Sequence, residues 1–237
     1  MTAPACTQVT VATPDGAMPA RLWVPPRGRG PGLVVVQEIF GVSDYIQRRS
    51  ADLAAQGYVV LAPEVYWRLD DQEIDEHAED ALQQGMSVAS RVDWESAVKD
   101  LRAAFTGLRE RPEVTGDVGL LGFCFGGGLA FNVAAYEDPK VLVSYYGSAL
   151  PGLLDLADRV KAASLHHFGL ADSFIAVEEV ERIRAAVTRR ANAIFLTYAD
   201  ANHAFDNPTL PMLYNPRASQ LAWTNTLEFL ARELPVQ

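Results

Sequence analysis

The strongest constraint on the fold is a series of short, continuous apolar runs separated by longer amphipathic stretches. From residue 33 onward, these runs have the length of strands that are buried on both faces. They cover residues 33–36, 58–62, 118–121, 141–145 and 193–198. A chain in which strands alternate with helices forms a parallel sheet with helices packed on both faces. We therefore expect an α/β fold with a doubly wound, mostly parallel sheet.

The amphipathic stretches predict where the helices lie. Several of them carry apolar residues at helical spacing and acidic residues near the start. The predicted helices lie near 45–56, 93–109, 127–136, 177–191 and 217–232. Residues 7–12 and 19–24 flank the turn Pro14-Asp15-Gly16 and predict an opening antiparallel pair of strands. The acidic stretch 69–80 is predicted to begin a solvated helix or to form an insertion over the sheet.

The composition is that of a compact domain. Of 237 residues, 49% are hydrophobic and 21% are charged, and these fractions exclude a disordered chain or a disulfide scaffold. An α/β sheet can hold roughly 250 residues as one domain. No Pro-, Gly- or Ser-rich linker is long enough to separate two domains. We expect a single domain over residues 1–237.

The charge and the cysteines narrow the partners and the compartment. A formal net charge of −10 repels nucleic acid and anionic membrane surfaces. Residues 1–10 lack the pattern of a signal peptide, and no apolar run approaches the roughly 18 residues of a membrane span. The two cysteines, Cys6 and Cys124, stand far apart in the sequence, which is typical of a reduced, cytoplasmic protein.

The segment Gly122-Phe123-Cys124-Phe125-Gly126 directly follows a predicted strand and precedes a predicted helix. Small residues two before and two after a nucleophile allow the sharp strand-to-helix turn that exposes its side chain at the edge of a sheet. The start of the helix also favours a thiolate over a thiol. The segment predicts Cys124 as a nucleophile, and a buried structural cysteine is the alternative.

A cysteine nucleophile needs a histidine base and a carboxylate that orients this base. Of the four histidines, His203 follows the last apolar run, where the chain order nucleophile, acid, histidine places the base. His77 lies in the acidic stretch, and His166 and His167 lie inside a strand-like run. We expect the first to be solvated and the other two to be core residues.

Asp172 is the predicted acid. It ends the strand-like run 165–168 and lies between the predicted nucleophile and base in the sequence. Asp200 is the competing candidate, but it is so close to His203 that both would have to share one short loop.

Glu38 stands directly after the predicted strand 33–36. In α/β-hydrolases, the loop after this strand supplies one amide of the oxyanion hole, so we expect Glu38 beside the nucleophile. A carboxylate near a thiol disfavours the thiolate and can keep the sulfur protonated until a substrate displaces it. The backbone amides of Ile39 and Phe125 are the expected oxyanion donors.

These residues resemble the dienelactone hydrolase family of α/β-hydrolases, the carboxymethylenebutenolidases. The resemblance extends over nearly the whole chain through Gln37-Glu38-Ile39-Phe40-Gly41, Leu61-Ala62-Pro63-Glu64-Val65-Tyr66-Trp67-Arg68, Gly122-Phe123-Cys124-Phe125-Gly126-Gly127, Asp172 and His203. Ordinary serine esterases lack both the Gln-Glu-Ile-Phe-Gly loop and the cysteine elbow.

The resemblance implies a hydrolase of lactones or esters with the triad Cys124, Asp172 and His203. It further implies that Glu38 contacts Cys124 in the resting enzyme while His203 pairs with Asp172, and that ligand binding reorganises the set to give a thiolate. The thiolate would form an acyl-enzyme that is then hydrolysed. The family needs no cofactor and no metal.

One departure from the family concerns the substrate. Members that act on dienelactone hold the substrate carboxylate with arginines, one of them shortly after the catalytic histidine, where this chain has Ala204-Phe205-Asp206-Asn207. A buried carboxylate without a cation is unfavourable, so a neutral or differently shaped ester or lactone is the expected substrate. The cations that could compensate are Arg68, Arg91 and Arg217.

Four residues are expected to line the substrate pocket because they follow predicted strands: Phe40, Tyr66, Trp67 and Arg68. Simple core packing is an equal alternative for Trp67. The expected partner is a small molecule, and the expected assembly is a monomer or a small homo-oligomer. Two other interpretations stay open, namely a ligand-binding relative without turnover and a peroxide-sensitive thiol at Cys124.

Overall fold

The computed structural model describes residue 4 and residues 6–237. Residues 1–3 and 5, part of the opening stretch in which no signal peptide is predicted, lie outside the described residues. The chain divides into two compact units, residues 1–120 with 235–237, and residues 121–234. The single domain expected over 1–237 stays a prediction.

The first unit is built on five strands in the order β1-β2-β4-β3-β5. The last of these, β5, continues into the second unit. The elements in chain order are β1 (Cys6–Thr13), β2 (Gly16–Trp23), β3 (Gly30–Val36), α1 (Asp44–Ala55), β4 (Val59–Pro63), α2 (Ala81–Ala89), α3 (Trp94–Arg109) and β5 (Val114–Phe123).

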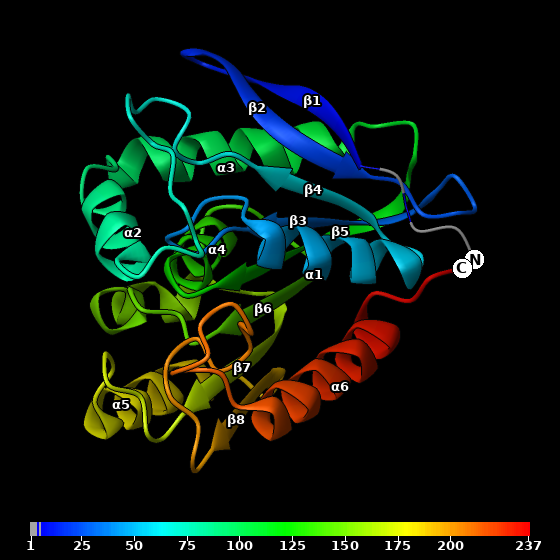
Figure 1. Ribbon diagram of the computed structural model, residues 1–237. Helices are drawn as coiled ribbons and strands as arrows, with labels where there is room; N and C mark the ends of the chain where they lie inside the picture. The colour runs from blue at the N-terminus through cyan, green and yellow to red at the C-terminus, as the bar shows by residue number, and fades with distance from the viewer. Residues whose placement is uncertain (1–3, 5) are drawn as a thin grey trace. The chain divides into compact units, whose positions relative to one another are not determined.

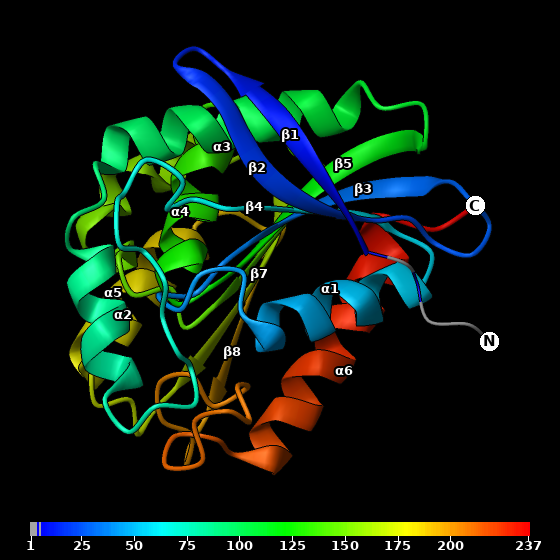
Figure 2. The same cartoon turned by 45° about the horizontal axis from the view of Figure 1, so that its top comes forward.

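Pairing in the first unit confirms the opening hairpin. β1 and β2 are antiparallel, and Thr13 pairs with Gly16 across the predicted turn. β2 is antiparallel to β4, which is parallel to β3. Both β3 and β4 are buried along their whole length, as their continuous apolar sequences predict. The helices α1 and α3 cover opposite faces of these two strands (Figures 1 and 2).

The second unit contains the end of β5 followed by parallel strands in the order β6-β7-β8. Its helices α4 and α5 lie on one side of these strands and α6 lies on the other (Figure 1). The elements are α4 (Phe125–Ala134), β6 (Val141–Tyr145), η1 (Leu150–Gly152), η2 (Leu154–Arg159), β7 (Ala163–Gly169), α5 (Val177–Val187), β8 (Ala193–Tyr198) and α6 (Pro216–Glu233). Parallel strands covered on both faces confirm the predicted α/β class.

The acidic stretch 69–80 is an insertion and does not begin a helix, because α2 starts only at Ala81. The Asp75 carboxylate accepts the N–H of His77 at 3.0 Å, and such a local hydrogen bond competes with helix formation. Arg91 donates to the carbonyl oxygens of Asp70 and Asp71, which fixes the stretch in an irregular path. No helix among the described residues has the length and hydrophobicity needed to cross a bilayer.

Candidate active site

Cys124 stands between β5 and α4 in a strained backbone conformation, with φ 53° and ψ −117°. Such conformations cost about 1–3 kcal/mol and persist only where the surroundings enforce them. A Cβ atom at Gly122 would lie 2.1 Å from the carbonyl oxygen of Gly126. Only glycine therefore allows the strand to turn this sharply into the helix, as the elbow pattern predicts.

Hydrogen bonds fix the elbow against the end of β6. The Cys124 N–H donates to the carbonyl oxygen of Tyr145, and the Cys124 carbonyl oxygen accepts the N–H groups of Gly127 and Ser148. The Ser148 hydroxyl oxygen lies 4.0 Å from the Cys124 sulfur. The backbone of Cys124 is thus held by hydrogen bonds on both sides.

Three predicted residues come together in the second unit. His203 Nε2 lies 3.0 Å from the Cys124 Sγ, and His203 Nδ1 lies 2.8 Å from the Asp172 Oδ2. The side chains of His203 and Asp172 are 6% and 0% exposed, so water contributes little to either contact. Thiol, imidazole and carboxylate form one continuous chain of contacts. In this structure the sulfur lies within hydrogen-bond reach of the imidazole.

The acid and the base are held by their own loops. The second carboxylate oxygen of Asp172 accepts the N–H groups of Phe174 and Ile175, at 2.8 and 2.9 Å. The Asn202 side-chain oxygen accepts the N–H of His203 at 2.7 Å and the N–H of Ser173 at 2.8 Å. This amide joins the loop after β7 to the loop after β8, so the two catalytic candidates keep one relative position.

The electrostatics of the chain favour an imidazolium. Burial alone would lower the pKa of His203, but the negative charge of Cys124 as a thiolate and the contacts with Asp172 outweigh it. The pKa of His203 is raised to about 10. An imidazole with a raised pKa is a strong proton acceptor, and its two partners here are the Cys124 sulfur and the Asp172 carboxylate.

The competing acid and the other histidines have different surroundings. Asp200 is exposed, and its carbonyl oxygen accepts a hydrogen bond from Asn215, whereas Asp172 contacts His203. His167 is buried and bonded to Tyr198 and Thr226. His166 is fully buried as well, but its two ring nitrogens have no hydrogen-bond partner among the described residues.

The segment after His203 turns away into the fold. The buried Asp206 carboxylate accepts the hydroxyl of Ser219 from α6 at 2.6 Å. The Asn215 N–H donates to the carbonyl oxygen of Phe205 at 3.0 Å, which ties together the two ends of the stretch 206–214. Met212 within this stretch is 94% exposed.

In the first unit, the structure brings together two of the motifs that carry the family resemblance. The Gln37 side chain accepts the N–H of Val65 at 3.0 Å, and the Tyr66 hydroxyl donates to the carbonyl oxygen of Ile39 at 3.0 Å. Glu38 between them is 1% exposed. A cavity of about 370 Å³ is lined by residues that include Arg21, Gln37, Phe40, Glu64 and Tyr66.

Trp67 and Arg68 are not part of the lining of this cavity. The Trp67 indole N–H donates to Asp100 at 2.8 Å, and Arg68 forms a bidentate pair with the same carboxylate. The Arg68 guanidinium also pairs with Asp15 at 3.0 Å. Arg68 thereby joins the turn between β1 and β2 to α3, and Trp67 is hydrogen-bonded to α3.

Sequence reasoning missed four residues of the site: Tyr146, Ser148, Phe174 and Asn202. The rings of Tyr146 and Phe174 each lie 5.1 Å from the His203 imidazole. None of these residues belongs to a motif of recognised spacing. Their only signal is that they stand close after strand ends, in the loops where ligands bind in doubly wound sheets.

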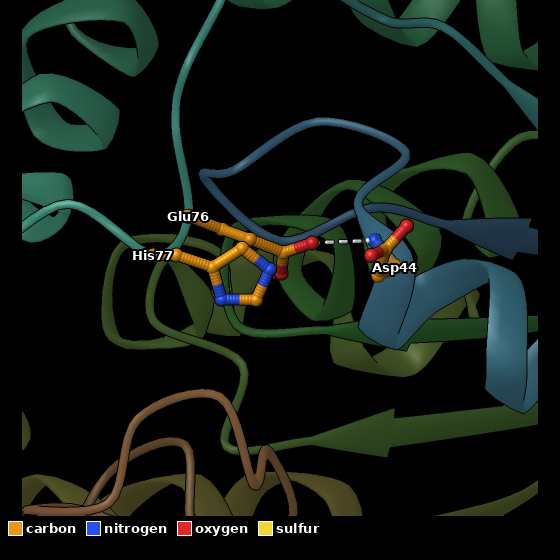
Figure 3. A group of neighbouring side chains, drawn as sticks. All are labelled: Asp44, Glu76 and His77. Atoms are coloured by element: carbon orange, nitrogen blue, oxygen red, sulfur yellow. Dashed lines mark hydrogen bonds between the residues drawn. The ribbon is translucent and has the colours of Figure 1, made fainter.

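A group of possible metal ligands lies in the first unit, where one ligand atom each of Asp44, Glu76 and His77 falls within 4.8 Å of the others (Figure 3). The Glu76 carboxylate accepts the N–H of Asp44 at 2.6 Å. Asp44 is the first residue of α1, and an acidic partner at a helix start is favourable. This contact explains the group as a helix cap.

Comparison with known proteins identifies the family. Residues 18–234 match the profile of the Dienelactone hydrolase family. The chain belongs to this family. It is 36% identical over 223 residues to a carboxymethylenebutenolidase of Pseudomonas sp.. The aligned region covers 93% of this chain and 92% of the relative. A carboxymethylenebutenolidase of Pseudomonas putida is 33% identical over 208 residues, or 87% of this chain and 88% of the relative.

A solved structure agrees with this assignment. A candidate dienelactone hydrolase from Klebsiella pneumoniae subsp. pneumoniae has a TM-score of 0.84 and 27% identity, and the match covers 98% of this chain and 100% of the other. This member of the dienelactone hydrolase family is therefore a hydrolase with the α/β-hydrolase fold, and its substrate is a small molecule.

Proposed function

We propose that this protein hydrolyses carboxylic esters or lactones through an acyl-enzyme on Cys124. The observation that carries the proposal is the continuous chain of Sγ, imidazole and carboxylate, with contacts of 3.0 and 2.8 Å. His203 acts first as the base and then as the acid, and Asp172 orients its ring and stabilises the imidazolium.

The thiol proton first passes to His203, and in the acylation step the resulting Cys124 thiolate attacks the carbonyl carbon. A C–S bond forms, and the carbonyl π electrons move to the oxygen. When this tetrahedral intermediate collapses, the C–O bond to the alcohol breaks and His203 gives its proton to the leaving oxygen. The product is a thioester on Cys124. Asp172 favours this sequence because its two oxygens are both engaged, one by the imidazole and the other by backbone N–H groups.

In the deacylation step, a water molecule replaces the alcohol beside the imidazole. His203 takes a proton from this water as its oxygen attacks the thioester carbon. The C–S bond then breaks, which releases the carboxylic acid and restores the contact between the free Cys124 sulfur and the protonated His203. No other group has to carry the proton. The same chain of residues therefore supports both steps.

We further propose that the backbone amides of Phe125 and Ile39 bind the oxyanion and that Glu38 modulates the thiol. Phe125 begins α4 directly after the nucleophile, where this fold carries one oxyanion donor. Glu38 is the second residue after β3 and is almost fully buried. A Glu38→Gln variant tests its role, because loss of the charge should raise the rate of thiol alkylation without substrate.

The proposed substrate is neutral. Arg68 is engaged by Asp100 and Asp15, and Arg91 donates to loop carbonyl oxygens. Arg217 lines a separate hollow in the second unit, next to Asp200. The position after the base where dienelactone enzymes carry an arginine lies in a segment that holds the buried Asp206. Arg21 in the cavity of the first unit is paired with Glu64 at 3.6 Å. These contacts leave little support for a carboxylate ligand.

Cytoplasmic location and a monomeric or small homo-oligomeric state are also proposed, on the sequence grounds given above. A ligand-binding relative without turnover has no specific support, because the acid-base chain is complete. The redox interpretation is weak as well, since Cys6, the other cysteine, stands in β1 of the other unit.

The test compares the hydrolysis of 4-nitrophenyl acetate with that of cis-dienelactone, with Cys124→Ala as the blank. We expect Cys124-dependent hydrolysis with a preference for the neutral ester, and an acetyl adduct on Cys124 in the mass spectrum of the quenched reaction. Cys6→Ala is the matched control and should keep full activity. Equal rates for Cys124→Ala and the unaltered protein would overturn the proposed function.

A further inference from the structure

The His203 imidazole is contacted by two aromatic side chains of opposite exposure. The ring centroids of Tyr146 and Phe174 each lie 5.1 Å from that of the imidazole. Tyr146 is fully buried, whereas Phe174 is 48% exposed. Of the two rings, only Phe174 can offer a face to a bound molecule.

Phe174 is also fixed in place. Its backbone N–H donates to Asp172 at 2.8 Å, and the next residue, Ile175, is 3% exposed and anchors the loop. A single exposed phenylalanine on a surface needs no explanation. Here, however, the backbone of Phe174 is hydrogen-bonded to the proposed acid Asp172, and its exposed ring lies against the imidazole of the proposed base.

The chemistry determines which part of an ester lies next to this ring. When the tetrahedral intermediate collapses, the proton on His203 must reach the oxygen of the leaving alcohol, which requires a hydrogen bond to Nε2. The acyl group stays on the Cys124 sulfur. The alcohol part of the substrate therefore lies on the imidazole side of the reacting carbon, and Phe174 flanks that imidazole.

We propose that Phe174 is a specificity-determining residue that selects esters with an apolar leaving alcohol. This inference rests on the proposed function and extends it from the reaction to the alcohol group of the substrate. An apolar alcohol removes water from the exposed part of the ring, which stabilises the complex in proportion to the buried area.

Two acetate esters of different alcohols test the inference. Hexyl acetate and methyl acetate give the same acyl-enzyme, so their deacylation rates are identical by construction. For Phe174→Ala, we expect the ratio of kcat/KM for hexyl to methyl acetate to fall about tenfold relative to the unaltered protein, the scale of one or two lost methylene contacts. The deacylation rate, measured in a single turnover, should stay within about twofold.

Two further variants give the comparison its controls. Phe174→Leu keeps an apolar side chain and should retain most of the preference for hexyl acetate. Val177→Ala removes another half-exposed apolar side chain, 45% exposed at the start of α5, and should leave the ratio unchanged. If Phe174 only supported the triad, its removal would lower kcat/KM for both esters and the deacylation rate together. The ratio of kcat/KM for hexyl to methyl acetate would then stay unchanged.

The outcomes separate the two claims. If neither ester nor any aryl ester is hydrolysed in a Cys124-dependent manner, the proposed function fails and this inference fails with it. Suppose that both esters are hydrolysed, but that Phe174→Ala leaves the ratio of their kcat/KM values unchanged or lowers the deacylation rate as much as kcat/KM. The hydrolase assignment then stands and the proposed role of Phe174 is wrong.

Discussion

Replacing His166 should make the protein more resistant to mild acid. His166 lies in β7, is fully buried, and stacks near Phe195 with ring centroids 6.1 Å apart. Its two ring nitrogens have no hydrogen-bond partner among the described residues. Burial lowers the pKa of His166 to about 4, so the native state keeps this imidazole neutral at pH 5.

The size of the effect follows from the unfolded chain. There the imidazole has its ordinary pKa of about 6.5, so at pH 5 proton binding stabilises the unfolded state by about 2 kcal/mol, against only about 0.2 kcal/mol at pH 7. Because the native pKa lies below the unfolded one, stability is complete above pH 6.5 and is lost as the pH falls toward 4. His166→Leu and His166→Gln both remove this titration.

Urea unfolding followed by tryptophan fluorescence at pH 7 and pH 5 provides the measurement. When the pH is lowered from 7 to 5, the free energy of unfolding of each variant should fall by about 2 kcal/mol less than that of the unaltered protein. This difference does not depend on the stability of the variant at pH 7. The leucine variant should also be the more stable of the two at pH 7, since it leaves no polar atom unpaired. His77→Gln at an exposed position is the control. A stability difference between variant and unaltered protein that is the same at both pH values would refute this reasoning.

Three further predictions concern the site. Gly122→Ala should abolish activity and lower the yield of folded protein, because the added Cβ would meet a backbone carbonyl oxygen 2.1 Å away and backbone cannot shift cheaply; an active, stable variant would contradict this. Asp206→Arg should destabilise the protein by at least about 3 kcal/mol in thermal unfolding without creating dienelactone activity, because the position is fully buried; a stable variant that gains this activity would show that the cation can be restored. The pKa of His203 is raised to about 10, so its imidazolium signals in NMR spectra should persist until the pH approaches 10. In Cys124→Ala these signals should disappear at a lower pH. Identical titrations of the two proteins would show that the thiolate does not raise this pKa.

Much of the fold could be predicted because its signals are local. The turn Pro14-Asp15-Gly16 and the continuous apolar run before the elbow each depend on a few adjacent residues. The start of α4 was less predictable. The helix begins at Phe125, two residues earlier than expected, although glycine is a poor helix former. A Cβ at Gly128 would lie 2.6 Å from that of Ala149, so close packing against this residue requires glycine inside the helix.

Some residues of the candidate site also have local sequence signals, whereas the roles of others depend on distant partners. Cys124, Asp172 and His203 could be proposed together from the sequence because their order and their places after strand ends are local features. The role of Arg68 could not, since its partner Asp100 lies 32 positions away on α3 and nothing local links the two. Phe174 was missed for a related reason, because the path of the loop after β7 decides which ring reaches the imidazole.

The tie between Asn215 and Phe205 has a consequence for how this enzyme can change. It closes the stretch 206–214 into a loop whose two ends stay together whatever lies between them, while Asn202 holds the base from the other side. Doubling the length of such a loop costs only about 0.6 kcal/mol in closure entropy, and exposed loop tips tolerate insertions. The chain around Met212 is thus a region where new residues can be accepted without a change in the distances among Cys124, His203 and Asp172, which makes it the natural starting point for a library that seeks altered substrate range.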